Sequence, residues 1–306
     1  MPVTFASRFA VAQRWADPLA ERLQPLIRRA VSPPPIRNFL DGVWLGTPLH
    51  PPLTDVPVGA WTTALLLDGG SVLSGDEALG AAADRALAVG TIAAVPAAVT
   101  GLNDLRDLVG QSRRIAMVHA LVNLLGLSLS AASLAYRHAG RRGLARGLSG
   151  LGFVTSSTAA HLGGKLSFAL GIRVNRTVGQ PVPGSFVPVL DAAELQGDEL
   201  HSVEVDGVPV LLARSQSGEV CALANTCTHL GGPLAEGSRE GDTVTCPWHG
   251  SRFDLRTGAV VEGPAVFVQP RLEARVREDK IEIGFPTAAG AELPELANLQ
   301  APARPS

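Results

Sequence analysis

The sequence has little cysteine and no concentration of charge. Its 306 residues include only three cysteines, charged residues make up 18%, and the formal net charge is −2. No stretch forms a basic face, and no glycine-rich phosphate-binding loop occurs. Nucleic acid is therefore not an expected partner.

Two short motifs stand out against this background. CTHLGGP begins at Cys227 and CPWHGS begins at Cys246, with sixteen residues between His229 and Cys246. Each motif offers one thiolate and one imidazole, as C-x-H and then C-x-x-H. A [2Fe–2S] centre with two Cys on one iron and two His on the other needs this donor set. A structural zinc site is the alternative, but zinc fingers usually pair C-x(2–4)-C with H-x(3–5)-H, whereas here Cys and His alternate. The spacing favours an iron–sulfur centre that carries electrons.

The region from about Val187 to Ile283 resembles a Rieske domain. The similarity extends past the motifs into SRFDLRTGAVVEGPA, from Ser251 to Ala265. The resemblance implies that Cys227 and Cys246 ligate one iron of a [2Fe–2S] cluster and that His229 and His249 ligate the other. It also implies a set of residues around the cluster: Leu230, Gly232, Trp248, Ser251, Phe253 and Pro264.

Departures from one branch of this family are informative. Rieske proteins of quinol-oxidising complexes have an extra Cys in each loop, and here Gly232 and Trp248 stand at those places. The same branch has a Tyr where this chain has Phe253, although Ser251 is kept. Fewer hydrogen bonds to the cluster sulfurs lower the reduction potential, toward the lower part of the Rieske range of about −150 to +300 mV. The resemblance is thus to the ferredoxin and oxygenase type.

The rest of this half reads as short strands. Apolar and polar residues alternate from His201 onward, with turn dipeptides at Asp206–Gly207 and Ser217–Gly218. This rhythm predicts a small antiparallel β-sandwich. Cys221 lies in a predicted strand and matches no ligand position, so we expect a buried free thiol. With the other two cysteines assigned to iron, no disulfide is available, which suits a reducing compartment.

The first half supplies most of the apolar residues. Four segments are long and apolar enough to predict membrane helices, namely 53–73, 83–105, 115–136 and 148–170. A soluble bundle is the alternative, because Asp55, Asp68 and Lys165 lie in or near these segments. No cleavable signal is expected before Arg37. That arginine-bearing stretch predicts an amphipathic interfacial arm or, alternatively, a soluble helix.

Residues from about Phe39 to Val174 resemble a bacterial family of four-helix membrane domains of unassigned function. The motifs that carry the resemblance are GTPLHPPLTDVPVGAW and HLGGKLSFALGIRV. The predicted fold is multidomain, α then β: a four-helix transmembrane bundle followed by an antiparallel β-sandwich. We expect an arm at 1–38, the helical domain at 39–176, a Pro/Gly linker at 177–185, the Rieske domain at 186–285 and a disordered tail at 286–306.

Several polar residues, among them Asn103 and Asp104, are expected at one depth in the helical domain, and four others at this depth form a candidate cofactor site. These four are His50, Asp55, His119 and His161. Ionisable groups in a membrane bundle are costly, and their default interpretation is functional. One hypothesis is that His119 and His161 bind a haem or flank a quinone or proton site. The favoured alternative is that the imidazoles cap helices and hydrogen-bond between them, since no ligand spacing singles them out.

Two classes of function follow. The first is a membrane-anchored one-electron carrier that serves a redox partner protein. The second is a subunit of a membrane oxidoreductase whose helical domain binds haem or quinone. A terminal oxygenase is disfavoured, because no domain with a 2-His-1-carboxylate iron triad is present. The flanking arginines and the missing disulfide predict both termini on the cytoplasmic side, and a homo-oligomer is possible.

Overall fold

The computed structural model describes residues 14–180 and 185–284. These residues divide into two compact units, a helical one that includes Pro48–Ile172 and a second one that includes residues 173–180 and 185–284. The segment Gly42–Thr47, with the 3₁₀ turn Val43–Leu45, belongs to the second unit. The predicted tail at 286–306, the first thirteen residues of the predicted arm and residues 181–184 of the predicted linker lie outside the described residues.

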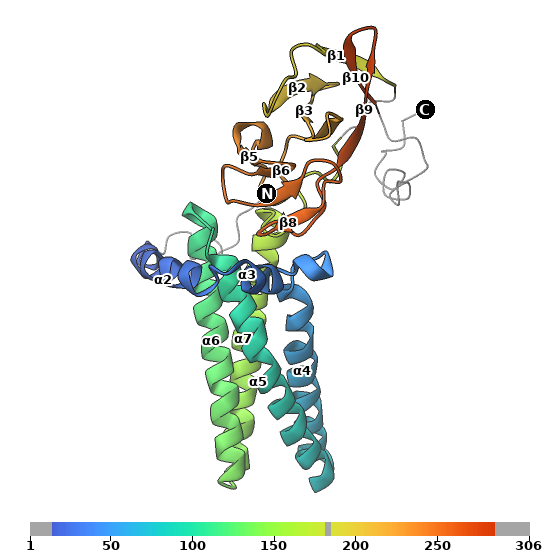
Figure 1. Ribbon diagram of the computed structural model, residues 1–306. Helices are drawn as coiled ribbons and strands as arrows, with labels where there is room; N and C mark the ends of the chain where they lie inside the picture. The colour runs from blue at the N-terminus through green and yellow to red at the C-terminus, as the bar shows by residue number, and fades with distance from the viewer. Residues whose placement is uncertain (1–13, 181–184, 285–306) are drawn as a thin grey trace, which may run out of the picture. The chain divides into compact units, whose positions relative to one another are not determined.

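Four long helices make up the helical unit. They are α4 (His50–Ser74), α5 (Glu77–Leu105), α6 (Gly110–His138) and α7 (Arg142–Gly164), and they run side by side in Figure 1. Glycine in the left-handed conformation ends α4 at Gly75, and the Asp76 carboxylate accepts the Ala78 amide to begin α5. These caps allow a two-residue turn, so α4 and α5 form a tight hairpin. A short π-helix, Lys165–Ala169, follows α7.

Three of these helices, not four, are long and apolar enough to cross a membrane: α4, α5 and α6. The expectation of a fourth span at 148–170 is therefore wrong. α7 is long enough, with 23 residues, but glycine, serine and threonine fill much of it, and His161 lowers its hydropathy further. Small residues lengthen the apolar run of α7 without adding much hydropathy, and they serve close helix packing.

Side chains of the helical unit are distributed as in a membrane protein. Large apolar residues such as Leu66, Leu73 and Ile92 are exposed, while alanine, glycine and serine fill much of the interior. A Cβ on Gly152 would lie 3.1 Å from the Gly126 carbonyl oxygen, so α6 and α7 pack backbone to backbone there. This arrangement is typical of helices that face lipid.

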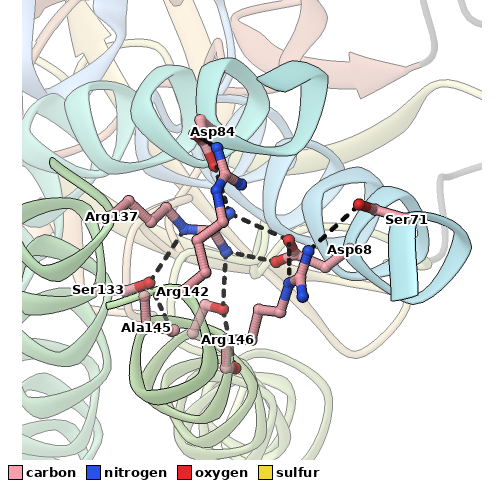
Figure 2. Close-up of polar contacts among 9 residues, drawn as sticks. Asp68, Ser71, Asp84, Ser133, Arg137, Arg142, Ala145 and Arg146 are labelled. Carbon is pink, nitrogen blue, oxygen red and sulfur yellow. Dashed lines mark hydrogen bonds and ion pairs between the residues drawn. The ribbon is translucent and has the colours of Figure 1, made fainter. Parts of the chain in front are cut away.

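The charges inside the bundle are compensated. At one end, Arg137 pairs with both Asp68 and Asp84, and its Nη1 lies 2.6 Å from Asp84 Oδ1. Figure 2 shows Arg142 and Arg146 completing this network, at 2.9 Å from Asp84 and 3.3 Å from Asp68. Asp68 is therefore not an isolated charge, and its presence does not argue for a soluble bundle over a membrane bundle.

Two shorter helices pack on the other end of the bundle, α2 (Ala16–Ala30) and α3 (Pro34–Asp41). The Gln24 side-chain amide donates to the carbonyls of Leu105 and Leu108 at 2.9 and 2.8 Å. Asp41 forms a buried two-point ion pair with Arg106, with both N···O distances at 2.8 Å. The described part of the predicted arm thus contains α2 and the first part of α3, both held on the bundle.

The described residues of the second unit form ten antiparallel strands in two sheets. The larger sheet has the order β1-β10-β9-β4-β3-β2 and the smaller one β5-β6-β7-β8. The strands are β1 (Val187–Asp191), β2 (His201–Val205), β3 (Val208–Arg214), β4 (Val220–Ala224), β5 (Ser238–Glu240), β6 (Thr243–Thr245), β7 (Arg252–Asp254), β8 (Val260–Glu262), β9 (Arg271–Arg277) and β10 (Lys280–Gly284). The predicted hairpin turn at Asp206–Gly207 is confirmed, with both residues at positive φ.

The core of the second unit lies on both faces of β3. Val210 and Leu212 pack in one apolar cluster with residues of β4, β9 and β10. Leu211 points to the opposite face and packs in a second cluster that contains Phe253 of the smaller sheet. The two sheets therefore share an interior, as the predicted sandwich requires. This second cluster also contains Cys227 and Cys246.

Candidate metal centre

The first motif forms a loop between β4 and the 3₁₀ turn Leu234–Glu236. The Cys227 carbonyl accepts the Gly231 amide at 2.9 Å, and the Cys227 amide donates to the Gly232 carbonyl at 2.8 Å. Gly231 has a φ of +86°, which a side chain would strain. These bonds close a tight loop around the side chain of Cys227.

The second motif, between β6 and β7, repeats the same pattern of hydrogen bonds. The Cys246 carbonyl accepts the Gly250 amide at 3.1 Å, and the Cys246 amide donates to the Ser251 carbonyl at 2.8 Å. Gly250 also has a positive φ, of +73°. Two loops of different sequence thus have the same backbone geometry, with His229 two residues after its Cys and His249 three residues after its own.

Both cysteine side chains are buried and close together. Cys227 is 1% exposed and Cys246 is 3% exposed, and their side chains hydrogen-bond to one another. That bond lowers the pKa of Cys246 and, with burial, raises the pKa of Cys227 above its usual range. Backbone amides two and three residues along each loop also stabilise the thiolates.

The imidazoles of the two motifs lie together as well. The ring centres of His229 and His249 are 5.1 Å apart, and the ring planes are nearly perpendicular, at 87°. Two imidazoles bound at about 2.1 Å to one tetrahedral metal ion have ring centres about 5 Å apart. The spacing of this pair fits two ligands of a single iron.

Gly232 makes the close approach of the two loops possible. A Cβ at this position would lie 2.8 Å from Cys246 Sγ and 3.0 Å from Trp248 Cγ. Any other residue would push one loop away from the other. Phe253 is fully buried in the apolar cluster that contains both cysteines, whereas Trp248 is 56% exposed.

A third loop, Gly263–Gln269, is tied to both motif loops. Ser251 Oγ accepts the Ala265 amide at 3.0 Å, and Thr228 Oγ1 donates to the Phe267 carbonyl at 3.0 Å. The predicted neighbour Pro264 is buried in this third loop, and its carbonyl accepts from Arg173 Nη1 at 2.8 Å.

Sequence reasoning missed Gln269. This side chain is fully buried, and its amide donates to the carbonyls of Ala224 and Thr226 at 2.6 and 2.7 Å. Its carbonyl accepts the Thr228 amide at 3.1 Å. Gln269 therefore holds the backbone on both sides of Cys227. Gln269 has no fixed sequence spacing from the two motifs. Its position as a single polar residue in an apolar stretch was the one feature of the sequence that could have indicated its role.

Of the four predicted polar residues in the helical unit, the structure brings two together. The ring centres of His50 and His119 are 6.5 Å apart, whereas Asp55 and His161 are exposed. The two paired imidazoles hydrogen-bond to backbone carbonyls of neighbouring helices, as the favoured alternative anticipated. Within residues 14–180 and 185–284, no three His, Cys, Asp or Glu side chains converge on one point. A [2Fe–2S] cluster needs only two protein ligands for each iron.

Comparisons with known proteins match both halves of the chain. Residues 185–272 match the Rieske [2Fe-2S] domain, and residues 46–176 match the family described as "Predicted membrane protein (DUF2231)". The chain is 30% identical to mouse (Mus musculus) apoptosis-inducing factor 3 over 95 residues, which are 31% of this chain and 16% of that protein. It is 28% identical to ferredoxin CarAc of Metapseudomonas resinovorans over 98 residues, 32% of this chain and 92% of the ferredoxin.

A solved structure gives a similar match. The ferredoxin of carbazole 1,9a-dioxygenase from Nocardioides aromaticivorans IC177 is 28% identical, with a TM-score of 0.32, and the match covers 33% of this chain and 99% of the ferredoxin. By the family matches, the chain carries a C-terminal Rieske [2Fe–2S] domain, and a domain of the DUF2231 family precedes it.

Proposed function

We propose that this chain is a membrane-anchored one-electron carrier, and that Cys227, Cys246, His229 and His249 hold its [2Fe–2S] cluster. The observation that carries the proposal is the pair of matched loops, which brings two buried sulfurs and two imidazoles together from separate strands. The cysteines would bind one iron and the histidines the other.

The residues around the loops would hold and tune the cluster. When bound, the cluster supplies one-electron chemistry at the potential that its surroundings set. Backbone amides donate to both cysteine sulfurs, and Gln269 fixes the backbone beside Cys227. Phe253 offers no hydroxyl near the sulfurs, which supports a potential in the lower part of the range of about −150 to +300 mV.

Electrons would enter and leave through the imidazole side of the site. His249 is half-buried and His229 is 9% exposed, so His249 offers the more open of the two rings. Trp248, largely exposed beside it, would form part of the docking surface. The proposed partner is an oxidoreductase protein that exchanges single electrons with this surface. Similarity to a ferredoxin over nearly its whole length supports a carrier more than a self-sufficient enzyme.

The side of the membrane is also part of the proposal. The predicted orientation depends on four spans, and three candidate spans do not place both termini on one side. The free thiol of Cys221 still favours a cytoplasmic Rieske domain, because cysteines stay reduced in a reducing compartment. Accessibility of a tag after Gly284 in intact cells and in inverted vesicles measures the orientation directly.

Low-temperature EPR of the reduced full-length protein, combined with a redox titration, tests the ligand assignment. We expect His229→Cys and His249→Cys each to change the Rieske-type signal while the protein remains in the membrane. His201→Cys is the matched control, because this histidine lies in β2 and pairs with Glu199 at 3.0 Å. Unchanged spectra in both ligand variants would refute the assignment.

A further inference from the structure

The two helix hairpins of the helical unit each hold one histidine in the same way. His50 of α4 places its Nδ1 2.9 Å from the Ala97 carbonyl oxygen of α5. His119 of α6 places its Nδ1 2.8 Å from the Ala159 carbonyl oxygen of α7. The first helix of each hairpin supplies the imidazole, and the second supplies the carbonyl that orients it.

The packing around each ring is repeated too. Four residues after each of these alanines stands a glycine, within the pattern A-A-x-x-G at 97–101 and again at 159–163. A Cβ on Gly101 would lie 2.9 Å from His50 Cε1, and a Cβ on Gly163 would lie 3.0 Å from His119 Cε1. Each ring therefore packs directly against the backbone of a helical glycine. Two hairpins of different sequence hold an imidazole in the same way.

These hydrogen bonds fix the tautomer of both rings. A carbonyl oxygen only accepts, so Nδ1 carries the proton in each histidine, and Nε2 of the neutral ring keeps its lone pair. Metal-binding histidines show this arrangement, with one nitrogen donating to a backbone carbonyl while the other binds the metal. Asn123 Nδ2 lies 3.2 Å from His119 Nε2, so this asparagine would have to turn away when a metal binds.

The distance between the two rings selects a coordination geometry. Their centres are 6.5 Å apart and their planes are nearly perpendicular, at 88°. Two imidazoles bound at about 2.1 Å on opposite sides of one metal ion have ring centres about 6.4 Å apart. The pair at the Rieske site, at 5.1 Å, fits adjacent ligands instead. His50 and His119 are therefore spaced as opposite ligands of a single ion.

We propose that His50 and His119 are the two axial ligands of a haem iron held between the hairpins. Among the described residues no third His, Cys, Asp or Glu side chain joins this pair. An octahedral iron with two opposite protein ligands needs four more donors in one plane, and a tetrapyrrole supplies them. Helical bundles hold such cofactors with side chains from facing helices. The inference adds a second one-electron centre to the proposed carrier and does not depend on the ligands of the first.

The test begins with the full-length protein, purified in detergent from cells supplied with δ-aminolaevulinate. We expect a Soret band, a low-spin ferric EPR signal and one haem per chain by the pyridine haemochrome assay. The haem should extract into acidified acetone, because the sequence has no C-x-x-C-H attachment motif. Haemin added to haem-depleted protein should rebind and saturate at one per chain.

Variants connect the haem to the two histidines. His50→Ala and His119→Ala should each lower the Soret absorbance per chain at least tenfold, whereas His161→Ala, an exposed histidine of α7, should retain it. Gly163→Ala should shift the haem spectrum, because its methyl group would press on His119, and Gly150→Ala should not, because its Cβ meets nothing within 4 Å. Monodisperse elution of each variant from a size-exclusion column in detergent serves as the folding control for the helical unit.

Two results would overturn this proposal and leave the carrier function standing. The first is a protein with a full Rieske signal that contains no haem and shows no saturable binding of haemin. The second is haem that is retained in full in either His50→Ala or His119→Ala. In either case the imidazoles serve only to hydrogen-bond the helices together. Loss of the Rieske signal with haem retained would instead count against the proposed cluster site alone.

Discussion

Replacing Gln269 with methionine tests whether this buried side chain holds the first ligand loop. Methionine has a similar length and volume but cannot form the three hydrogen bonds that Gln269 makes with Ala224, Thr226 and Thr228. Two of these bonds are fully buried. Each buried group left unsatisfied costs about 1–3 kcal/mol. The bond to the Thr226 carbonyl is only partly buried, so its loss costs less. Together the three losses should lower the free energy of unfolding by about 3–5 kcal/mol.

Urea denaturation of the full-length protein, followed by the visible circular dichroism of the cluster, measures this loss. With a dependence of about 2 kcal/mol per molar urea, the midpoint should fall by about 2 M. Gln196→Met is the matched control, because the Gln196 amide donates to Ala193 at an exposed site. Its midpoint should change by less than about 0.3 M, since exposed substitutions are usually within about 0.5 kcal/mol. Equal midpoints for the two variants would refute the bracing role of Gln269.

Three further predictions concern other parts of the chain. Ser251→Ala should lower the reduction potential of the cluster by on the order of 50 mV, and Phe253→Tyr should raise it, because a hydroxyl near the sulfurs stabilises the reduced cluster. An EPR-monitored titration measures both shifts, and shifts of the same sign would contradict this reasoning. Burial raises the pKa of Cys221 to about 11, so at pH 8 its thiolate should be about a hundredfold scarcer than that of an ordinary thiol. Mass spectrometry should find it unmodified by iodoacetamide at pH 8 in the folded protein and modified after denaturation, and rapid alkylation of the folded form would be inconsistent with its burial. Asp68→Asn should destabilise the helical unit by about 3–5 kcal/mol, since it breaks a buried ion-pair network, and its melting temperature in detergent should fall well below that of Asp55→Asn, the exposed control.

The cluster motifs could be found from sequence because their chemistry is local. Each loop places a thiolate and an imidazole within four residues, so the donor set is visible without knowledge of the fold. The matching backbone hydrogen bonds of Cys227 and Cys246 follow from glycines at equivalent positions, Gly231 and Gly250. Gln269 lies far along the chain and reaches Cys227 only through strand pairing, so sequence spacing does not reveal it.

The helical half was less predictable because its interior consists of small residues. Helix positions follow from apolar length, but a run such as α7, rich in glycine and serine, reads as a span although its hydropathy is too low. The choice between His50 and His161 as the partner of His119 depends on how the hairpins pack against each other. The repeated A-A-x-x-G pattern at 97–101 and 159–163 was a signal that periodicity alone did not identify.

Metal and sulfide analysis of the anaerobically purified protein, with EPR after reduction, tests the central claim most directly. If the matched loops hold a Rieske cluster, each chain contains two acid-labile sulfides and at least two irons, and the reduced protein gives the signal of a cluster with mixed Cys and His ligands. Stoichiometric zinc without acid-labile sulfide would contradict the account.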